Sequence, residues 1–179
     1  MSARYEQVNR TMGGLLAIWT RLRPWLIVGL WGIGLWAMSS ASVAWAADYN
    51  KEFLVGADFS HQDLTDSSFT SANLRNSNLS GSNLQGVSLF GANLEGADLS
   101  GADLRTALID NARLTHANLT NAILVGASAA NARFNGAKID GADFTDVLMR
   151  PDMEVYLCGI ATGTNPVTGR QTRDTLYCE

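Results

Sequence analysis

An apolar residue recurs at every fifth position through residues 57–151, and a small residue stands two positions before it. Two successive units, Ala92-Asn93-Leu94-Glu95-Gly96 and Ala97-Asp98-Leu99-Ser100-Gly101, show the pattern, and nineteen such units follow one another without a gap. A short fixed period of this kind indicates a solenoid, in which each unit packs only on its neighbours. The repeat therefore determines the architecture of more than half of the chain.

A period of five matches neither the helical period of 3.6 nor the strand period of 2, so the geometry has to be derived. In extended backbone the small residue and the apolar residue, two positions apart, point to the same side. The last two residues of a unit must then turn the chain. Turns of about a right angle close a square after four units, and stacked squares repeat at the strand spacing of about 4.8 Å. The sequence predicts an all-β, quadrilateral β-helix of about five coils.

The residue types at each position agree with this geometry. Of the nineteen small positions, thirteen are Ala and three are Ser, and the central position is Leu eleven times and Phe four times. A narrow packed coil has no room for a larger side chain at the small position, because extra volume in a packed interior costs about 1–3 kcal/mol. Eight units end in Gly and four in Asn, the residues that accept a positive φ in a tight turn.

These units resemble the motif A(D/N)LXX of the pentapeptide-repeat family, over about half of the chain. The resemblance implies a right-handed, four-sided β-helix, and the handedness comes from the resemblance alone. Some members of the family are acidic rods that resemble duplex DNA and bind topoisomerases.

The N-terminal segment has the features of a secretory signal. Its start is basic, and residues 25–47 carry no charge and end in an A-x-A pattern at Ala44 and Ala46. We expect residues 1–46 to be a signal peptide cleaved between Ala46 and Ala47. The alternative is an uncleaved membrane anchor, since the uncharged run reaches about 20 residues. Both interpretations place the repeats on the non-cytoplasmic side of the membrane. Met12 is an alternative initiator methionine.

The repeats are flanked by two shorter segments. Residues 47–56 are expected to form an N-terminal cap, with an imperfect coil at Leu54. Residues 152–179 lack the five-residue period and are expected to form a C-terminal cap, with a short helix over 153–161 followed by turns. In an exported chain the isolated pair Cys158 and Cys178 indicates a disulfide. A redox-active or metal-binding pair is the alternative, although the spacing is not C-x-x-C.

The sequence of this tail resembles a narrower group. The residues Leu157-Cys158, Ala161-x-Gly163-x-Asn165-Pro166-x-Thr168-Gly169 and Thr172-Arg173-Asp174-x-Leu176-x-Cys178 are similar to the C-terminal cap of thylakoid-lumen pentapeptide-repeat proteins of cyanobacteria and chloroplasts. The resemblance implies export to the thylakoid lumen, and the signal alone is also compatible with the periplasm.

The twenty-residue coil sorts the exposed residues onto four sides. Sides one and two carry Asp and Asn ladders, which we interpret as solvated polar surface because alternating carboxylates lie too far apart to share a metal. The third side carries a weak basic patch of Arg113, Arg133 and His116, which either binds an acidic partner or phosphate or is merely exposed.

The fourth side lacks Asp and Asn at its outward position and shows four apolar residues that we name the apolar strip: Phe90, Leu108, Ala130 and Leu148. Such a strip usually marks a contact surface, so we expect a partner or self-association face. The alternative is that the C-terminal tail folds back over it.

No residues in the sequence form a nucleophile–base pair, a phosphate-binding loop or a metal-ligand cluster, so no catalytic residue, metal or cofactor is predicted. The processed chain has nine Lys and Arg against sixteen Asp and Glu, a formal charge of −7, which disfavours nucleic-acid binding. We expect a non-catalytic exported scaffold or protein-binding module with an unknown protein partner. A topoisomerase-binding DNA mimic and an enzyme are the alternatives.

Overall fold

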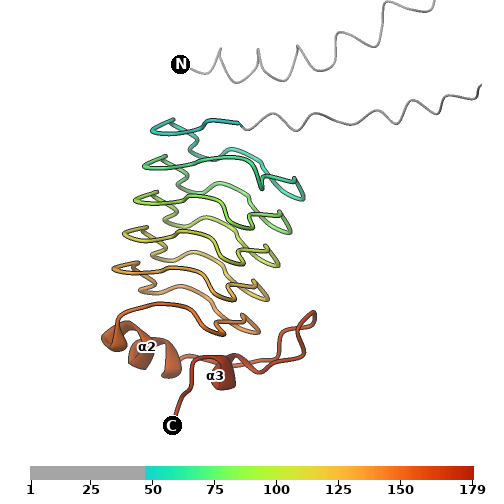
Figure 1. Ribbon diagram of the computed structural model, residues 1–179, viewed down its shortest axis with the longest axis vertical. Coiled ribbons are helices and arrows are strands. Elements are labelled where there is room, and N and C mark those ends of the chain that lie inside the picture. Colours follow the sequence, from blue (N-terminus) through green and yellow to red (C-terminus); the bar gives the residue numbers. More distant parts are fainter. Residues whose placement is uncertain (1–46) are drawn as a thin grey trace, which may run out of the picture. The chain divides into compact units, whose positions relative to one another are not determined.

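The computed structural model describes residues 47–179, in which a β-helix is followed by a C-terminal cap (Figure 1). Parallel β-bridges join each outward residue to the residue twenty positions later, from Asp48 with Ser68 to Ser128 with Leu148. The right-handed quadrilateral β-helix is thus confirmed. The predicted signal segment, with Ala44, Ala46 and Met12, lies outside the described residues. Neither helix within 47–179 has the length and apolar character to cross a bilayer.

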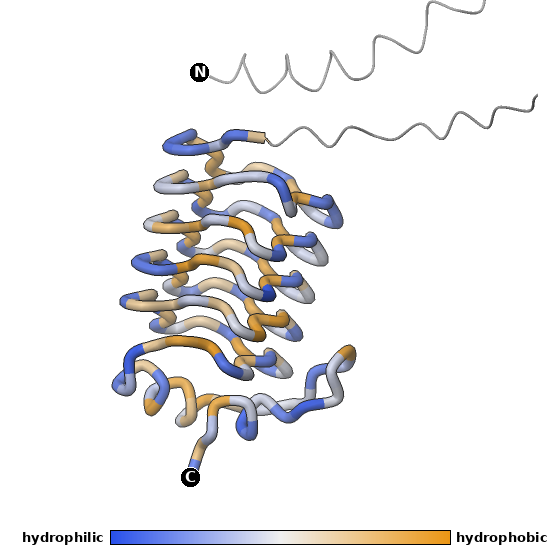
Figure 2. The backbone as a smooth tube through the Cα atoms, viewed as in Figure 1, coloured by the Kyte–Doolittle hydropathy of each residue, from blue (hydrophilic) through white to orange (hydrophobic). Residues whose placement is uncertain are grey.

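The interior contains the residues that the repeat predicts. The central side chains from Leu74 to Leu99 are fully buried, and the small residues Ala97 and Ala102 lie beside them with no exposed surface. Hydropathy alternates in register from coil to coil (Figure 2). Backbone bonds join the coils: the N–H of Leu74 donates to the carbonyl of Asn93 at 2.8 Å, and the N–H of Asn93 donates to the carbonyl of Ala72 at 2.9 Å.

Most corners have the hydrogen bond across four residues and the positive φ at the third residue that are typical of a type II turn. The N–H of Ala97 donates to the carbonyl of Leu94 at 3.0 Å, and Gly96 between them has φ +69°. Gly and Asn occupy this position as predicted, but His61, Thr106 and other non-glycine residues also adopt φ near +55° there. The neighbouring coils hold the backbone in register, so these residues adopt the left-handed conformation despite their Cβ atoms.

The sequence predicts an N-terminal cap over residues 47–56 with an imperfect coil at Leu54, and in the structure these residues form a regular continuation of the β-helix. Their bridges follow the same register as the later coils, and Leu54 is buried at a central position. Tyr49 takes the central position before it and stacks on Phe69, with ring centroids 4.8 Å apart. Phe53 points outward and is 80% exposed, so it does not cover the end of the stack.

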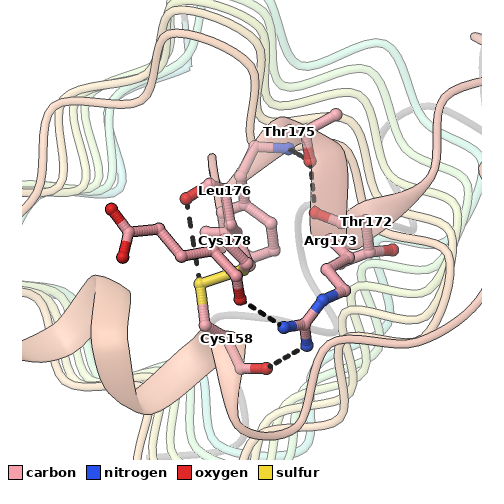
Figure 3. Close-up of a disulfide and its surroundings, with 8 residues drawn as sticks. Cys158, Thr172, Arg173, Thr175, Leu176 and Cys178 are labelled. Atoms are coloured by element: carbon pink, nitrogen blue, oxygen red, sulfur yellow. Dashed lines mark hydrogen bonds between the residues drawn. A yellow bond between two sulfur atoms is a disulfide. The ribbon is translucent and has the colours of Figure 1, made fainter.

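The C-terminal cap begins with α2 (Pro151–Cys158) and ends with the short α3 (Thr172–Thr175). The helix expected over 153–161 therefore starts earlier, because the fixed φ of proline suits the first turn of a helix, and α3 was not expected. The disulfide between Cys158 and Cys178 is present, with the Cα atoms 5.5 Å apart (Figure 3). Arg173 donates to the carbonyls of Cys158 and Glu179, which ties the two ends of the cap together.

The cap supplies hydrogen-bond acceptors that a further coil would have provided. The N–H of Gly136 donates to the Tyr156 hydroxyl at 2.9 Å, that of Gly141 to the Thr162 carbonyl at 2.8 Å, and that of Phe144 to the Thr175 hydroxyl at 3.0 Å. An unpaired strand edge invites association with other chains, so these bonds both close and protect the end of the β-helix.

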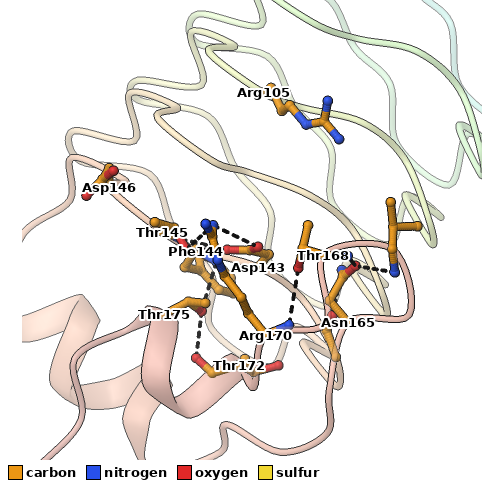
Figure 4. Close-up of polar contacts among 12 residues, drawn as sticks. Arg105, Asp143, Phe144, Thr145, Asp146, Asn165, Thr168, Arg170, Thr172 and Thr175 are labelled. Atoms are coloured by element: carbon orange, nitrogen blue, oxygen red, sulfur yellow. Dashed lines mark hydrogen bonds and ion pairs between the residues drawn. The ribbon is translucent and has the colours of Figure 1, made fainter.

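Asn165 anchors the loop between the two helices (Figure 4). It is fully buried, and its amide donates to the carbonyls of Asn121 and Gly141 at 3.1 and 2.8 Å. Its Oδ1 accepts the N–H groups of Val167 and Thr168. The sequence indicates only turns here, whereas the structure shows a buried side chain that joins this loop to two coils.

A buried carboxylate joins the cap to the last coil beside this loop. Asp143 has no exposed surface, and its Oδ2 lies 3.5 Å from Nη1 of Arg170. Burial raises the pKa of Asp143, but hydrogen bonds from the hydroxyl and N–H of Thr145, aided by Thr168 and Arg170, outweigh it and leave the pKa below its usual value. Asp143 is thus ionised in the folded protein.

Ala102→Leu should lower the free energy of unfolding by about 1–3 kcal/mol, because the larger side chain overpacks a filled interior. Ala130→Leu is the matched control, since Ala130 is exposed and should tolerate the same change. Urea unfolding followed by circular dichroism measures both. Equal effects at the two positions would contradict the assigned interior.

Asp143→Asn should destabilise the protein at neutral pH and reduce its acid sensitivity. A carboxylate with a lowered folded pKa stabilises the fold above its unfolded pKa of about 3.9, and this stability is lost as the pH falls through the folded pKa. The stability difference between wild type and variant should therefore shrink between about pH 5 and pH 2. Urea unfolding at each pH tests this, with the exposed Asp66→Asn as control. A difference that stays constant with pH would refute the role of Asp143.

Candidate functional site

The Asp and Asn ladders of sides one and two are occupied by local structure. Oδ1 of Asp98 accepts the N–H of Ser100 at 3.0 Å, and Oδ1 of Asp103 accepts the N–H of Arg105 at 3.2 Å. The N–H and hydroxyl of Ser60 likewise hold the pKa of Asp58 below its usual value. The Asn side chains of these ladders likewise accept the backbone N–H two residues ahead, and the amide of Asn118 also donates along the stack to Oδ1 of Asp98 at 3.0 Å. This local bond explains why the position favours Asp and Asn.

Within residues 47–179 no three His, Cys, Asp or Glu side chains converge as a metal site. His61 and His116 lie at corners of different coils, each with a positive φ. The cysteines are joined in the disulfide and do not titrate.

The arginines of the third side are stacked as the twenty-residue register predicts. Arg113 and Arg133 are bridge partners in adjacent coils. Glu95, one coil earlier, lies 3.7 Å from Arg113 and 3.6 Å from Arg75, so one carboxylate serves two guanidinium groups. The side chain of Arg133 forms no ion pair or hydrogen bond with any residue of 47–179.

His116 does not belong with these arginines, contrary to the grouping predicted from the sequence. It occupies the corner at the far end of its unit, where its ring packs over Gly136 so closely that a Cβ at that glycine would clash with it. Arg113 and Arg133 instead lie toward the opposite corner, at Asn111 and Asn131. His116 is the fifth residue of its unit, so its place at a corner follows from the repeat, and the spacing of three residues alone led to the wrong grouping.

Arg150 takes the place that we assigned to His116. Arg113, Arg133 and Arg150 line a cleft of about 420 Å³ between the third side and the start of α2, which we name the arginine cleft. Arg150 follows Ala130 by twenty residues, so the sequence predicts that the two residues lie next to each other in adjacent coils. Its approach to the cleft also depends on where α2 begins, and the repeat does not determine this.

The apolar strip is exposed on the fourth side. Phe90 is 46%, Leu108 47% and Leu148 70% exposed, and Ala130 is exposed as well. The C-terminal tail leaves Leu108 and Leu148 uncovered, contrary to the alternative in which it folds back over them. Between these residues, Oδ1 of Asp110 accepts the Ser128 hydroxyl and the Ala130 N–H at 2.6 and 2.8 Å, so this polar side chain is committed to the coil.

The chain matches the family model described as pentapeptide repeats, with eight copies. The matched segments overlap and together span more than half of the chain: 54–89, 67–105, 88–124 and 112–150. The crystal structure of a pentapeptide repeat protein from the thylakoid lumen of Arabidopsis thaliana is 46% identical, with 74% of this chain and 86% of that chain covered and a TM-score of 0.60.

Two further relatives are similar over shorter stretches. The thylakoid lumenal 15 kDa protein 1 of Arabidopsis thaliana is 63% identical over 38 residues, 21% of this chain, and the match spans only 17% of that protein. The solved pentapeptide repeat protein Rfr23 from the cyanobacterium Cyanothece 51142 is 27% identical over 52% of this chain and 65% of its own, with a TM-score of 0.51. The repeats, the fold and these matches together show that the chain belongs to the pentapeptide-repeat family.

Proposed function

We propose that this chain is a non-catalytic protein-binding module of the thylakoid lumen. The lumenal location is supported by the relative from the Arabidopsis thaliana thylakoid lumen, which is similar over most of both chains. It is also supported by the signal-like segment 1–46 and by a disulfide, which persists in an oxidising compartment.

The apolar strip is the observation that supports protein binding. The interior of the β-helix is filled by buried side chains, so a partner has access only to the outer sides. On the fourth side Leu108 and Leu148 occupy the outward position at which the other sides place mostly polar residues. Apolar side chains gathered on one face of an acidic rod favour a protein partner, because burying them against it removes apolar surface from water.

The strip is tested with Phe90→Asp and Leu108→Asp in one variant. We expect at least a tenfold loss of partner recovered by affinity capture from lumenal and membrane fractions, because each substitution places a charge in an apolar contact. Sedimentation velocity of the purified variant shows whether the partner is a second copy of the chain.

The control for this experiment is Val167→Asp, in a loop of the cap where the valine is 71% exposed. The control should retain the wild-type partners and solution mass. Unchanged partners and unchanged mass in the strip variant would refute the strip as the binding face.

The location is tested separately by fractionation of the native host. We expect a mature chain that begins at Ala47 and co-fractionates with lumenal proteins, because the A-x-A site precedes that residue. N-terminal sequencing of the recovered protein identifies the start. A cytoplasmic chain that retains its first twenty residues would refute the proposal and favour the acidic, topoisomerase-binding alternative.

A further inference from the structure

The arginine cleft brings positive charge together on a molecule that is acidic as a whole. The chain has a formal net charge of −4, yet Arg113, Arg133 and Arg150 face one cleft. Its neutral walls include Asn111 and Asn131 at the adjoining corner. A volume of about 420 Å³ lies within the range of small-molecule sites, roughly 300–1,000 Å³.

The positive charge in the cleft is only partly compensated. Asp152 is the single acidic residue in the lining, and it holds Arg150 through two hydrogen bonds of 2.9 and 3.0 Å. Arg113 reaches Glu95 only at 3.7 Å and shares that carboxylate with Arg75. Arg133 has no partner within the described part of the chain, and its guanidinium is available to a ligand.

The stacking of Arg113 on Arg133 is itself unfavourable. The two residues are partners in a parallel bridge, and adjacent strands lie about 4.8 Å apart, a spacing at which like charges opposite each other destabilise a sheet. An anion between the two guanidinium groups would relieve this repulsion. The electrostatics of the cleft therefore favour a negatively charged ligand.

We propose that the arginine cleft binds the phosphate group of a small phosphorylated molecule. Guanidinium groups present planar forks of N–H donors that match phosphate oxygens in pairs. Three guanidinium groups offer more donors than the two oxygens of one carboxylate accept, whereas a phosphate monoester has three acceptor oxygens and a charge of about −1.5 to −2. The ligand is thus distinguished from a simple carboxylate by its number of oxygens and its charge.

The site depends on both parts of the fold. Arg113, Arg133 and Arg150 come from successive coils of the β-helix, and Asp152 and Met153 in the first turn of α2 supply the wall from the cap. The cleft shares no residue with the apolar strip, so this proposal is independent of the protein-binding function above.

Binding is measured by NMR on the full chain labelled with ¹⁵N-arginine, at constant ionic strength set with chloride. Inorganic phosphate and glycerol 3-phosphate are the two probes, which separate free phosphate from a phosphorylated compound. We expect saturable shifts of the side-chain Nε–H signals of Arg113, Arg133 and Arg150 with at least one probe. Arg105 and Arg170, on another side and in the cap loop, should not shift.

Two substitutions give opposite predictions. Arg133→Gln should weaken binding at least tenfold, because it removes the unpaired guanidinium. Asp152→Asn should strengthen binding severalfold, because it removes the carboxylate that competes with the ligand for Arg150. The matched controls are Arg105→Gln for Arg133→Gln and Asp174→Asn for Asp152→Asn. Each removes the same charge at a position outside the cleft and should leave the dissociation constant unchanged. Circular dichroism checks that each variant is folded.

Three results would overturn the proposal. The first is that neither inorganic phosphate nor glycerol 3-phosphate gives saturable shifts of the arginine signals at concentrations up to 10 mM. The second is an equal response to acetate or a stronger response to citrate, which would assign the cleft to carboxylates. The third is an unchanged dissociation constant in folded Arg133→Gln.

Discussion

The twenty-residue register between adjacent coils is the constraint on which this structure depends. Each coil meets its backbone hydrogen-bonding needs mainly through the coils before and after it, as in the bonds from Leu74 to Asn93 and from Asn93 to Ala72. A slip of one residue would turn the central leucines outward and bring polar residues into the interior. The register therefore explains why leucine and alanine fill the interior and why corner residues adopt a positive φ.

The same constraint creates a difficulty at the end of the stack, where a coil has no successor. The cap meets it with groups of different kinds: a tyrosine hydroxyl, a main-chain carbonyl and a threonine hydroxyl accept the last N–H groups of the coil. Asn165, the ion pair of Asp143 with Arg170 and the disulfide hold these acceptors in place. The cap residues that make these contacts do not follow the five-residue period, because each one pairs with a particular backbone group at the end of the β-helix.

A rod with a filled interior presents its functional groups on its outer sides. Most outward Asp and Asn side chains use Oδ1 to accept the backbone N–H two residues ahead, so they stabilise the coil itself. The surfaces that remain are those where the repeat departs from its consensus, at Leu108 and Leu148 on the fourth side and at Arg113 and Arg133 on the third. Departures from the consensus are therefore the informative positions in a chain of this family.

The sequence by itself determined the period, the twenty-residue coil, the inward residues and the side to which each outward residue belongs, because all of these follow from local repetition and backbone geometry. It also indicated the disulfide, from two cysteines in a chain with an export signal. Tertiary structure alone decided how Tyr156, Asn165 and Thr175 close the last coil, and that α2 begins where its first turn completes the arginine cleft beside Arg150. These features depend on where the chain turns and on how an aperiodic cap packs against the last coil, and such long-range contacts leave no period in the sequence.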